Sequence, residues 1–449
     1  MNSAMPHYRP ARAWSITFFL FIFMMVNYID KVALGLVAAP IMSEFNLTPT
    51  EFGLLASSFY WFFPIACVAG GFLANKYKAK SLLLIMALLW SLAQLPIIFA
   101  GSMLSIMLAR ILLGIGEGPA SSISTHAIFK WYPNERRNLP QTVMLMGATC
   151  GLMVASIAIP QIAEKWGWRA CFEVLGVVGL VWAALWWWLG AEGNLDTVAP
   201  VNNVAPVVVR KIPYRILLCN PTVLSTMMLF FVADWMVVLA TTWLPLYLQK
   251  GLGFDALAGG KLFALVVAIS IPINLLVSFI SQRMLTSGVS SRKARGTVAS
   301  IATILAGLLL IALVAMPVTA MQKVYLLAAA VGLAISVFTL AIGIIGEVVP
   351  VSQRGAMLSI SNAVATVGTF PAPVITGWLI QSSTGVSSSH GYEMGFLVAA
   401  VLMLIGAFIG YKGIDPEKAR KTLASWNGVA VGGVKSSVAG GGAFAKDAS

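Results

Sequence analysis

Residues 103–129 read MLSIMLARILLGIGEGPASSISTHAIF, a stretch whose only charged residues are Arg110 and Glu117. A helix of this length, at about 1.5 Å per residue, crosses the roughly 30 Å hydrocarbon core of a bilayer. An ionisable side chain inside that core costs about 2.5–3.5 kcal/mol on insertion scales. We therefore expect Arg110 and Glu117 to face a protein interior or a wet cavity, where opposite charges can neutralise each other.

The same pattern of long apolar stretches recurs along the whole chain. Of the 449 residues, 59% are hydrophobic and 10% are charged, whereas soluble domains contain about 25% charged residues. Twelve apolar blocks are long enough to span a membrane: 14–38, 51–73, 81–100, 103–129, 139–163, 171–190, 222–248, 257–281, 297–317, 323–346, 354–380 and 392–411. We predict an all-α integral membrane protein with twelve transmembrane helices.

The net charge of +13 is distributed unevenly between the loops that join these blocks. If the N-terminus lies inside, the inner loops hold most of the Lys and Arg residues and the outer loops hold few of them. This positive-inside bias predicts that both termini are cytoplasmic in a multi-pass protein of the bacterial inner (plasma) membrane. Basic loops of this kind indicate contact with anionic lipid headgroups, so we expect no nucleic-acid partner.

A polar stretch in the middle of the chain divides the blocks into two sets of six. We predict an N-terminal half at 1–190, a cytoplasmic linker at 191–221, a C-terminal half at 222–411, and a largely disordered cytoplasmic tail at 412–449. A Pro precedes an Arg by three or four residues after both the fourth and the tenth block. This repeat predicts two pseudo-symmetric halves with a binding site between them near the membrane midplane.

Charges also interrupt the first block, at Asp30 and Lys31. Asp30 lies about as far from the outer end of its block as Arg110 lies from the outer end of the fourth, which is about 10–12 Å below the surface. Glu117 follows Arg110 by two helical turns on the same face. We expect Asp30, Arg110 and Glu117 to form a ladder between facing helices in which the carboxylates gain and lose protons. A purely structural ion pair is the alternative, although apolar replacements of such pairs rarely cost stability.

Five segments resemble the motifs of one transporter family. They are residues 27–31 in the first block, 70–76 after the second, 89–91 in the third, 110–119 in the fourth and 243–248 in the seventh. Together they are similar to the major facilitator superfamily, and specifically to its anion:cation symporter family. The resemblance implies proton-driven uptake of an organic anion. It further implies proton coupling at Asp30 and Glu117, and substrate or charge-pair roles at Lys31 and Arg110.

Three positions depart from the pattern of that family. Lys31 stands where Arg is usual, so the cation remains but the bidentate fork for a carboxylate is lost. The Trp-Phe-Phe sequence at 61–63 lacks the Tyr of the family's Trp-x-Tyr, and Ala148 stands where sugar-acid members have Gln. Fewer hydrogen-bonding groups suit an aromatic or short aliphatic acid better than a sugar acid.

Asp234, in the seventh block, is a lone acid for which several roles remain open. It could be a third titrating group, a contact to the polar end of the substrate, or a partner of Lys31 across the halves. A protonated acid that donates one hydrogen bond is the structural alternative. The candidate substrate-binding residues are Lys31, Arg110, Tyr28, Trp61, Phe63, Asp234, Asn274 and Asn362. For the aromatic residues, packing in the bundle is the alternative role. For Asn274 and Asn362, the alternative is interhelical hydrogen bonding.

The loop after the second block differs from the superfamily motif. Asn75 stands where Asp is usual and Lys78 where Gly is usual, which places the gating charge relay of that loop in doubt. Glu347 and Arg354, at the inner ends of blocks ten and eleven, could pair in a cytoplasmic gate or could be solvated surface charges. The candidate gating residues are Asn75, Lys76, Lys80, Glu347 and Arg354.

We therefore expect a monomeric carrier that imports a small organic anion, a carboxylate, together with protons by alternating access. A proton-coupled drug or metabolite exporter is the alternative, but Lys31 and Arg110 would repel a cation. An enzyme or sensor is not supported, because no clustered catalytic residues and no sizeable soluble domain are evident. The scattered histidines and cysteines predict neither a metal site nor a cofactor.

Overall fold

The computed structural model describes residues 9–133, 136–194, 211–383, 385 and 387–426. Within these residues, twelve helical spans are long and apolar enough to cross a membrane. Each span lies close to its expected block, so the predicted all-α membrane fold is confirmed. The seventh span differs most, because it ends at Thr242 and not near residue 248.

Six spans form the N-terminal half of the bundle. Its elements are α1 (Pro10–Leu36), α2 (Ala38–Glu44), α3 (Pro49–Ser57), the 3-10 turn η1 (Ser58–Tyr60), α4 (Phe63–Lys76), α5 (Ala79–Ala93), α6 (Leu95–Ile98), α7 (Met103–Glu117), α8 (Ala120–Trp131), α9 (Asn138–Trp166) and α10 (Trp168–Leu189).

The other six spans form the C-terminal half. Its elements are α11 (Tyr214–Leu218), α12 (Pro221–Thr242), α13 (Leu244–Leu246), the π-helical η4 (Tyr247–Gly251), α14 (Ala256–Thr286), the π-helical η5 (Arg292–Thr297), α15 (Val298–Ala315), α16 (Ala320–Val348), α17 (Val351–Thr369), α18 (Pro371–Ser382), α19 (His390–Gly413) and α20 (Pro416–Trp426).

Several spans are interrupted, and prolines explain where. Pro64, Pro119, Pro245 and Pro371 lie at or beside the starts of α4, α8, α13 and α18. A proline donates no backbone hydrogen bond and disfavours helical geometry in the residue before it. The second, fourth, seventh and eleventh spans therefore each consist of shorter helical pieces.

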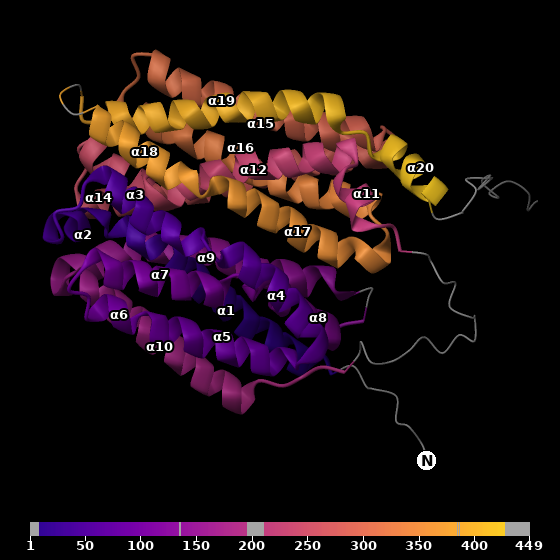
Figure 1. The fold of residues 1–449 in the computed structure, drawn as a ribbon, viewed down its shortest axis with the longest axis horizontal. Coiled ribbons are helices and arrows are strands. Elements are labelled where there is room, and N and C mark those ends of the chain that lie inside the picture. The colour runs from indigo at the N-terminus through magenta and orange to yellow at the C-terminus, as the bar shows by residue number, and fades with distance from the viewer. Residues whose placement is uncertain (1–8, 134–135, 195–210, 384, 386, 427–449) are drawn as a thin grey trace, which may run out of the picture.

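The two halves lie side by side along their length, as the indigo-to-purple and magenta-to-yellow ribbons of Figure 1 show. The start of α1, the linker residues next to α10 and α11, and α20 all lie at one end of the bundle, which we call the linker end. Across the interface α3 packs on α18, α4 on α17 and α9 on α14.

The crossing of α3 and α18 is unusually close and is nearly symmetric. A Cβ atom added to Gly53 of α3 would lie 2.3 Å from the carbonyl oxygen of Pro373 in α18. One added to Gly377 of α18 would lie 2.3 Å from the carbonyl oxygen of Pro49 in α3. Only glycine allows backbones to approach this closely, so these two residues bring the halves together at the end opposite the linker.

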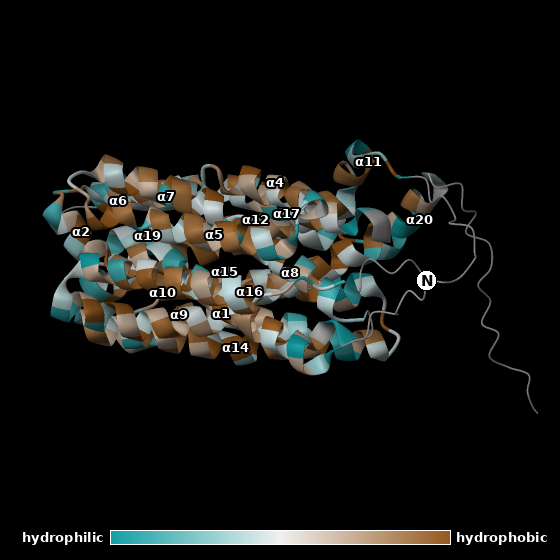
Figure 2. Cartoon of the chain, turned by 90° about the horizontal axis from the view of Figure 1, so that it is seen from below, coloured by the Kyte–Doolittle hydropathy of each residue, from teal (hydrophilic) through white to brown (hydrophobic). Residues whose placement is uncertain are grey.

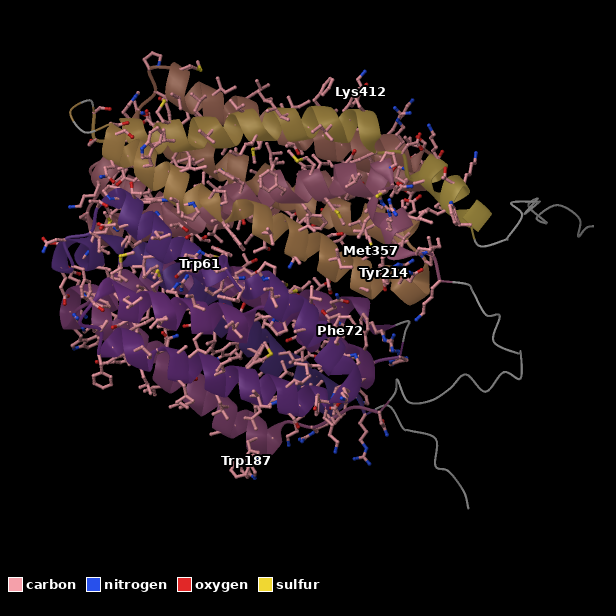
Figure 3. The ribbon with its side chains drawn as sticks, viewed as in Figure 1. Trp61, Phe72, Trp187, Tyr214, Met357 and Lys412 are labelled. Atoms are coloured by element: carbon pink, nitrogen blue, oxygen red, sulfur yellow. The ribbon has the colours of Figure 1, made fainter. Side chains whose placement is uncertain are left out.

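The surface of the bundle fits a protein surrounded by lipid. Hydrophobic residues dominate the length of the helices, and hydrophilic ones gather toward both ends (Figure 2). Large apolar side chains are exposed on this surface, among them Phe72, Phe99 and Trp187. Trp187 points away from the bundle (Figure 3), as an interfacial anchor would. The chain is a multi-pass membrane protein.

The linker and tail contain more structure than their composition predicted. The short helix α11 lies inside the linker, and α20 follows directly after the last span, so the start of the tail is not disordered. Asp415 accepts a hydrogen bond from the backbone N–H of Lys418 at 3.0 Å and so caps α20. Ala419 and Leu423, one turn apart, are buried against the C-terminal half. Residues 195–210 and 427–449 lie outside the described residues.

Candidate functional site

Lys31 reaches the interface between the halves from α1, within a group of aromatic rings. Its ammonium lies 4.7 Å from the ring centroid of Tyr28, 4.9 Å from that of Phe63 and 5.9 Å from that of Phe59. The rings come from α1, α4 and η1. Such contacts stabilise a cation by about 0.5–2 kcal/mol. Lys31 is only partly buried, so its charge is available to a ligand.

Arg110, on α7, is fully enclosed beside the same aromatic group. Only 3% of its surface is exposed, and its guanidinium carbon lies 4.7 Å from the centroid of Phe59. Phe59 therefore lies between the two cations. The approach of α7 to η1 depends on Gly114, because a Cβ there would lie 1.9 Å from the carbonyl oxygen of Phe59. Gly114 thus lets α7 lie close enough to η1 to place Arg110 in the interior.

Asp30 is buried next to Arg110, but the two side chains do not pair directly. Arg110 Nη1 donates to the backbone carbonyl oxygen of Asp30 at 3.3 Å. The carboxylate instead accepts a hydrogen bond from Gln94 Nε2, at the junction of α5 and α6, at 3.1 Å. Asp30 Oδ2 has no hydrogen-bond partner among the described residues. Asp30 and Arg110 therefore lie next to each other, but they contact each other through the backbone oxygen of Asp30 and not through its carboxylate.

Glu117 lies at the end of α7 and is 2% exposed. Neither of its carboxylate oxygens has a hydrogen-bond partner within the described part of the chain. Its charge interacts with those of Asp30, Lys31 and Arg110. A buried acceptor left without a partner costs about 1–3 kcal/mol, and a charged one costs more. Binding a proton would remove that charge and supply a donor, so the environment of Glu117 suits a carboxyl group that changes protonation.

Asp234 approaches the same region from α12 of the other half. Its Oδ2 accepts a hydrogen bond from Thr369 Oγ1 at 3.3 Å, and its charge attracts that of Lys31 across the interface. Asn362 lies on α17, which packs on α4 of the N-terminal half, in the neighbourhood of Cys67. Both candidates therefore lie where the halves meet.

Two other predicted substrate-binding residues lie apart from the Lys31 cluster. Trp61 lies near the line where the halves meet (Figure 3), but its Nε1 donates to Ser57 Oγ at 3.3 Å. Asn274, on α14, lies beside Ser278 and Thr339, within 3.4 Å and 3.5 Å of their hydroxyl oxygens. The structure brings neither of them to the rings around Lys31.

The predicted pair of Glu347 and Arg354 is not formed. Glu347 Oε2 instead lies 2.5 Å from Arg295 Nη1 and accepts a hydrogen bond from Ser291 Oγ. Arg295 belongs to η5, which packs against α16 and presents its guanidinium to Glu347. The side chain of Arg354 lies beside Gly346, and its Nε has no hydrogen-bond partner among the described residues. A charge pair does exist at this end of the C-terminal half, but with a different cation.

Two of the remaining gating candidates have described side chains. Lys76 is exposed, and Lys80 Nζ donates to the backbone carbonyl oxygen of Trp187 at 3.0 Å. The side chain of Asn75 lies outside those that the structure describes.

Glu192, which the sequence did not single out, organises the linker end of the N-terminal half. It pairs with Lys130 at 2.5 Å and accepts hydrogen bonds from the backbone N–H groups of Ala79 and Lys80 at the start of α5. Burial alone would raise the pKa of the Glu192 carboxyl, but the hydrogen bonds from Lys130 and from these backbone groups hold that pKa below its usual value. Its position just after the sixth span could have suggested a counterpart in the other half.

That counterpart is Glu417, just after the twelfth span. Its carboxylate accepts a hydrogen bond from the backbone N–H of Ser291 at 3.3 Å, immediately before η5. In each half, then, a glutamate that follows the last of the six spans contacts the start of the third span of the same half. This equivalence supports the predicted pseudo-symmetry of the halves.

Phe59 and Gln94 are the site residues that sequence reasoning missed. Gln94 is a polar residue in an otherwise apolar span and could have been found on that ground. Phe59 carries no distinguishing signal, because aromatic residues are common in membrane helices. Within the described residues, no group of three or more His, Cys, Asp or Glu side chains could hold a metal ion.

Comparison with known proteins identifies relatives of the chain. A family profile described as Major Facilitator Superfamily matches residues 20–328 and 284–441. The chain is 30% identical over 247 residues to the "Hexuronate transporter" of Bacillus subtilis, a match that spans 54% of this chain and 58% of that protein. It is 29% identical over 400 residues to the "Probable sulfoacetate transporter SauU" of Cupriavidus necator, which spans 85% of this chain and 89% of that one. Both are named as transporters and not as enzymes.

Solved structures share the fold. A bacterial homologue of the human lysosomal transporter Spinster, described as inward-facing and unoccupied, has a TM-score of 0.76 at 16% identity, covering 93% of this chain and 98% of that chain. A D-xylose-proton symporter has a TM-score of 0.70 at 17% identity, covering 90% and 99%. At these identities the likeness concerns the fold alone.

Proposed function

Because this chain belongs to the Major Facilitator Superfamily, we propose that it is a secondary active transporter that imports a small organic anion by proton symport. Relatives named for hexuronate and sulfoacetate support an organic anion as the substrate class. The observation that carries the proposal is Lys31, a partly buried cation at the interface of the halves, ringed by Tyr28, Phe63 and Phe59. A carboxylate or sulfonate is the natural ligand of such a cation.

The buried carboxyl groups supply the proton coupling in this proposal. Glu117 has no hydrogen-bond partner among the described residues, and Asp30 has one partly satisfied carboxylate. When protons bind Asp30 and Glu117, these groups no longer attract Arg110 and Lys31. Lys31 is then free to attract the substrate anion, so this one cation serves protein and substrate carboxylates in turn.

Alternating access would follow from rocking of the two halves around this site. The loaded interior is close to neutral, because bound protons offset the substrate charge, and a neutral interior crosses the hydrocarbon core at lower cost. After the site opens to the other side, anion and protons leave together. The close crossing of α3 and α18 supports a tight seal at the end opposite the linker.

We further infer that the linker end faces the cytoplasm of a bacterial inner membrane and that the carrier is a monomer. The described basic residues support the orientation, since Lys76, Lys130, Arg215, Arg295 and Lys421 belong to loops and helix ends at the linker end. Basic residues concentrate on the cytoplasmic side of membrane proteins. Both six-helix halves that surround the site belong to one chain, so the site needs no second copy, which supports a monomer.

The rings around Lys31 support a compact substrate with few hydroxyl groups. Tyr28 and Phe63 place their aromatic rings near the ammonium. Phe63 stands where the Trp-x-Tyr motif described above has a Tyr, so the hydroxyl group of that Tyr is missing here. An aromatic or short aliphatic acid would bury its apolar part against these rings while its charge pairs with Lys31.

Uptake by the purified protein in proteoliposomes tests the proposal. With the lumen alkaline, we expect accumulation of at least one of labelled sulfoacetate, benzoate, D-glucuronate and L-galactonate, and a protonophore should abolish it. Benzoate or sulfoacetate should compete better than L-galactonate. Uptake that is independent of the pH gradient would contradict proton symport, and preference for L-galactonate would contradict a substrate with few hydroxyl groups.

A further inference from the structure

Lys31 and Asp234 belong to opposite halves, on helices α1 and α12 that pack on each other, and they form no salt bridge in the part of the chain that the structure describes. Lys31 belongs to α1 and Asp234 to α12, and their charges attract across the interface. No carboxylate within the described residues makes a direct salt bridge to Lys31, which contacts aromatic rings instead. An anion that binds the ammonium of Lys31 therefore also lies near the carboxyl group of Asp234. If Asp234 is ionised, the two negative charges compete for one cation.

Thr369 gives Asp234 a partner that suits either protonation state. Its Oγ1 lies 3.3 Å from Asp234 Oδ2 and 2.9 Å from the backbone carbonyl oxygen of Thr366. A hydroxyl group has one hydrogen and two lone pairs, so it can donate to only one of these oxygens at a time. It can donate to an ionised Asp234, or it can accept from a protonated Asp234 while it donates to Thr366. Rotation of one hydrogen thus satisfies both states without moving a heavy atom.

Asp30 lacks such a partner. The atom that contacts its carboxylate is Gln94 Nε2, which can only donate. As placed, this nitrogen satisfies the ionised form of Asp30; to accept from a protonated Asp30, the amide would have to turn over and present its unpartnered Oε1. Of the acids near Lys31, Asp234 thus has the hydrogen-bond environment best arranged for repeated gain and loss of a proton.

Few other charged or titratable groups face Asp234. The cation is Lys31 from α1, and the neighbouring phenol is Tyr60 from η1. The contact from α17 is the uncharged hydroxyl of Thr369, and the charged residue of that helix, Arg354, lies in its first turn. The ionisable residues of the other helices packed on α12 lie toward the helix ends: Lys323 and Glu347 on α16, Glu393 and Lys412 on α19, and Arg215, Glu417, Lys418, Arg420 and Lys421 on α11 and α20.

We propose that Asp234 is a third proton-coupling residue, which releases Lys31 to the substrate anion by binding a proton itself. The proposal rests on the proposed function and adds to it. One proton from solution binds the Asp234 carboxylate as the anion binds Lys31, and the same proton leaves when the anion leaves. Asp234 thereby lets the C-terminal half, which otherwise contributes no acid to this site among the described residues, take part in coupling.

Proton uptake on ligand binding tests this directly. Purified protein in weakly buffered detergent solution, with a pH indicator dye, would be titrated with sulfoacetate, benzoate, D-glucuronate and L-galactonate in turn. By linkage, the pH slope of the logarithm of affinity equals the number of protons bound with the ligand. We expect Asp234→Asn to bind the anion at least as tightly as the wild type at alkaline pH, and to take up about one proton fewer. Glu173→Gln, which removes an exposed acid of α10, should match the wild type.

The remaining outcomes are distinguishable. An Asp234→Asn protein that takes up as many protons as the wild type would overturn the inference, and so would one that no longer binds the anion. Should Asp234→Asn fail to fold, the double variant Asp30→Asn/Glu117→Gln supplies the second protein, since of the three proposed coupling acids it retains Asp234 alone and should still take up about one proton as the anion binds. No uptake there would also overturn the inference. If the wild type binds none of the four anions, the proposed function itself fails.

Discussion

Lys31 combines a full charge with an aromatic surrounding that cannot neutralise it. The rings of Tyr28 and Phe63 stabilise the ammonium but supply no negative charge. Arg110, by contrast, is enclosed and bonded to a backbone carbonyl oxygen. The two cations therefore have different parts in the proposed cycle. Lys31 can exchange its partner for a ligand, whereas Arg110 balances the buried carboxylates of Asp30 and Glu117.

Replacing Lys31 tests that division. A charge-assisted hydrogen bond contributes about 1.5–3 kcal/mol, so Lys31→Gln should weaken anion affinity by about tenfold to a hundredfold. Lys31→Arg keeps the charge and should retain binding. The measurement is the KM for proton-driven uptake of sulfoacetate or benzoate in proteoliposomes. Equal KM values for Lys31→Gln and the wild type would show that the substrate binds elsewhere.

The identity of the charged residues could be predicted from sequence, but their partners could not. Asp30, Arg110 and Glu117 stand out because an ionisable group in an apolar span is costly, and all three are buried as expected. Which atom each one contacts depends on side-chain direction. That is why Arg110 bonds the backbone of Asp30, and why Gln94 contacts its carboxylate. Phe59, between the two cations, has no signature in the sequence.

At the scale of helices, breaks and crossings shape the site. The second span is interrupted between Ser57 and Phe63, and this interruption places Phe59 and Phe63 beside Lys31. Broken helices are common where transporters bind their ligands. The crossing of α3 and α18 lies on the same span, beyond the break, and holds the halves together through backbone contact at Gly53.

A single added methyl group tests this crossing. Gly53→Ala would place a carbon atom 2.3 Å from the carbonyl oxygen of Pro373, so the helices must separate. Overpacking of this kind costs about 1–3 kcal/mol, and we expect a lower melting temperature and slower transport. Gly71→Ala is the matched control, because nothing lies within 4 Å of a Cβ at that position of α4. Identical behaviour of the two variants would contradict a closed contact between α3 and α18.

The helices themselves were largely predictable, and the contacts at their ends were less so. Hydrophobic length determines where a span must lie, and the breaks follow from prolines such as Pro64 and Pro371. The partner of Glu347 was mispredicted because Arg295 and Arg354 are both basic residues near the same end. Helix α20 was missed because its two buried residues, Ala419 and Leu423, give too short an apolar pattern to recognise.

At the scale of the whole molecule, the charges are divided unequally between two similar halves. Asp30, Lys31, Arg110 and Glu117 all belong to the N-terminal half, and Asp234 belongs to the C-terminal half. The equivalent contacts of Glu192 and Glu417 show that the halves nevertheless share their construction at the linker end. A duplicated scaffold in which one half carries most of the charge can move as two bodies around one charged site. The duplication was visible in the sequence, but the position of Asp234 opposite Lys31 required the structure.

The central claim is that Glu117 couples proton movement to transport, and its amide variant tests this most directly. Glu117→Gln removes the titrating group and retains its size, with Glu173→Gln as the control for an exposed acid. Orientation in proteoliposomes can be scored by an impermeant maleimide, because Cys219 is exposed at the linker end, whereas Cys67 and Cys171 are buried and Cys150 is partly buried within α9. We predict that Glu117→Gln loses accumulation of sulfoacetate or benzoate under an inside-alkaline gradient but keeps exchange of the same anion across the membrane. Full accumulation by Glu117→Gln would contradict the account.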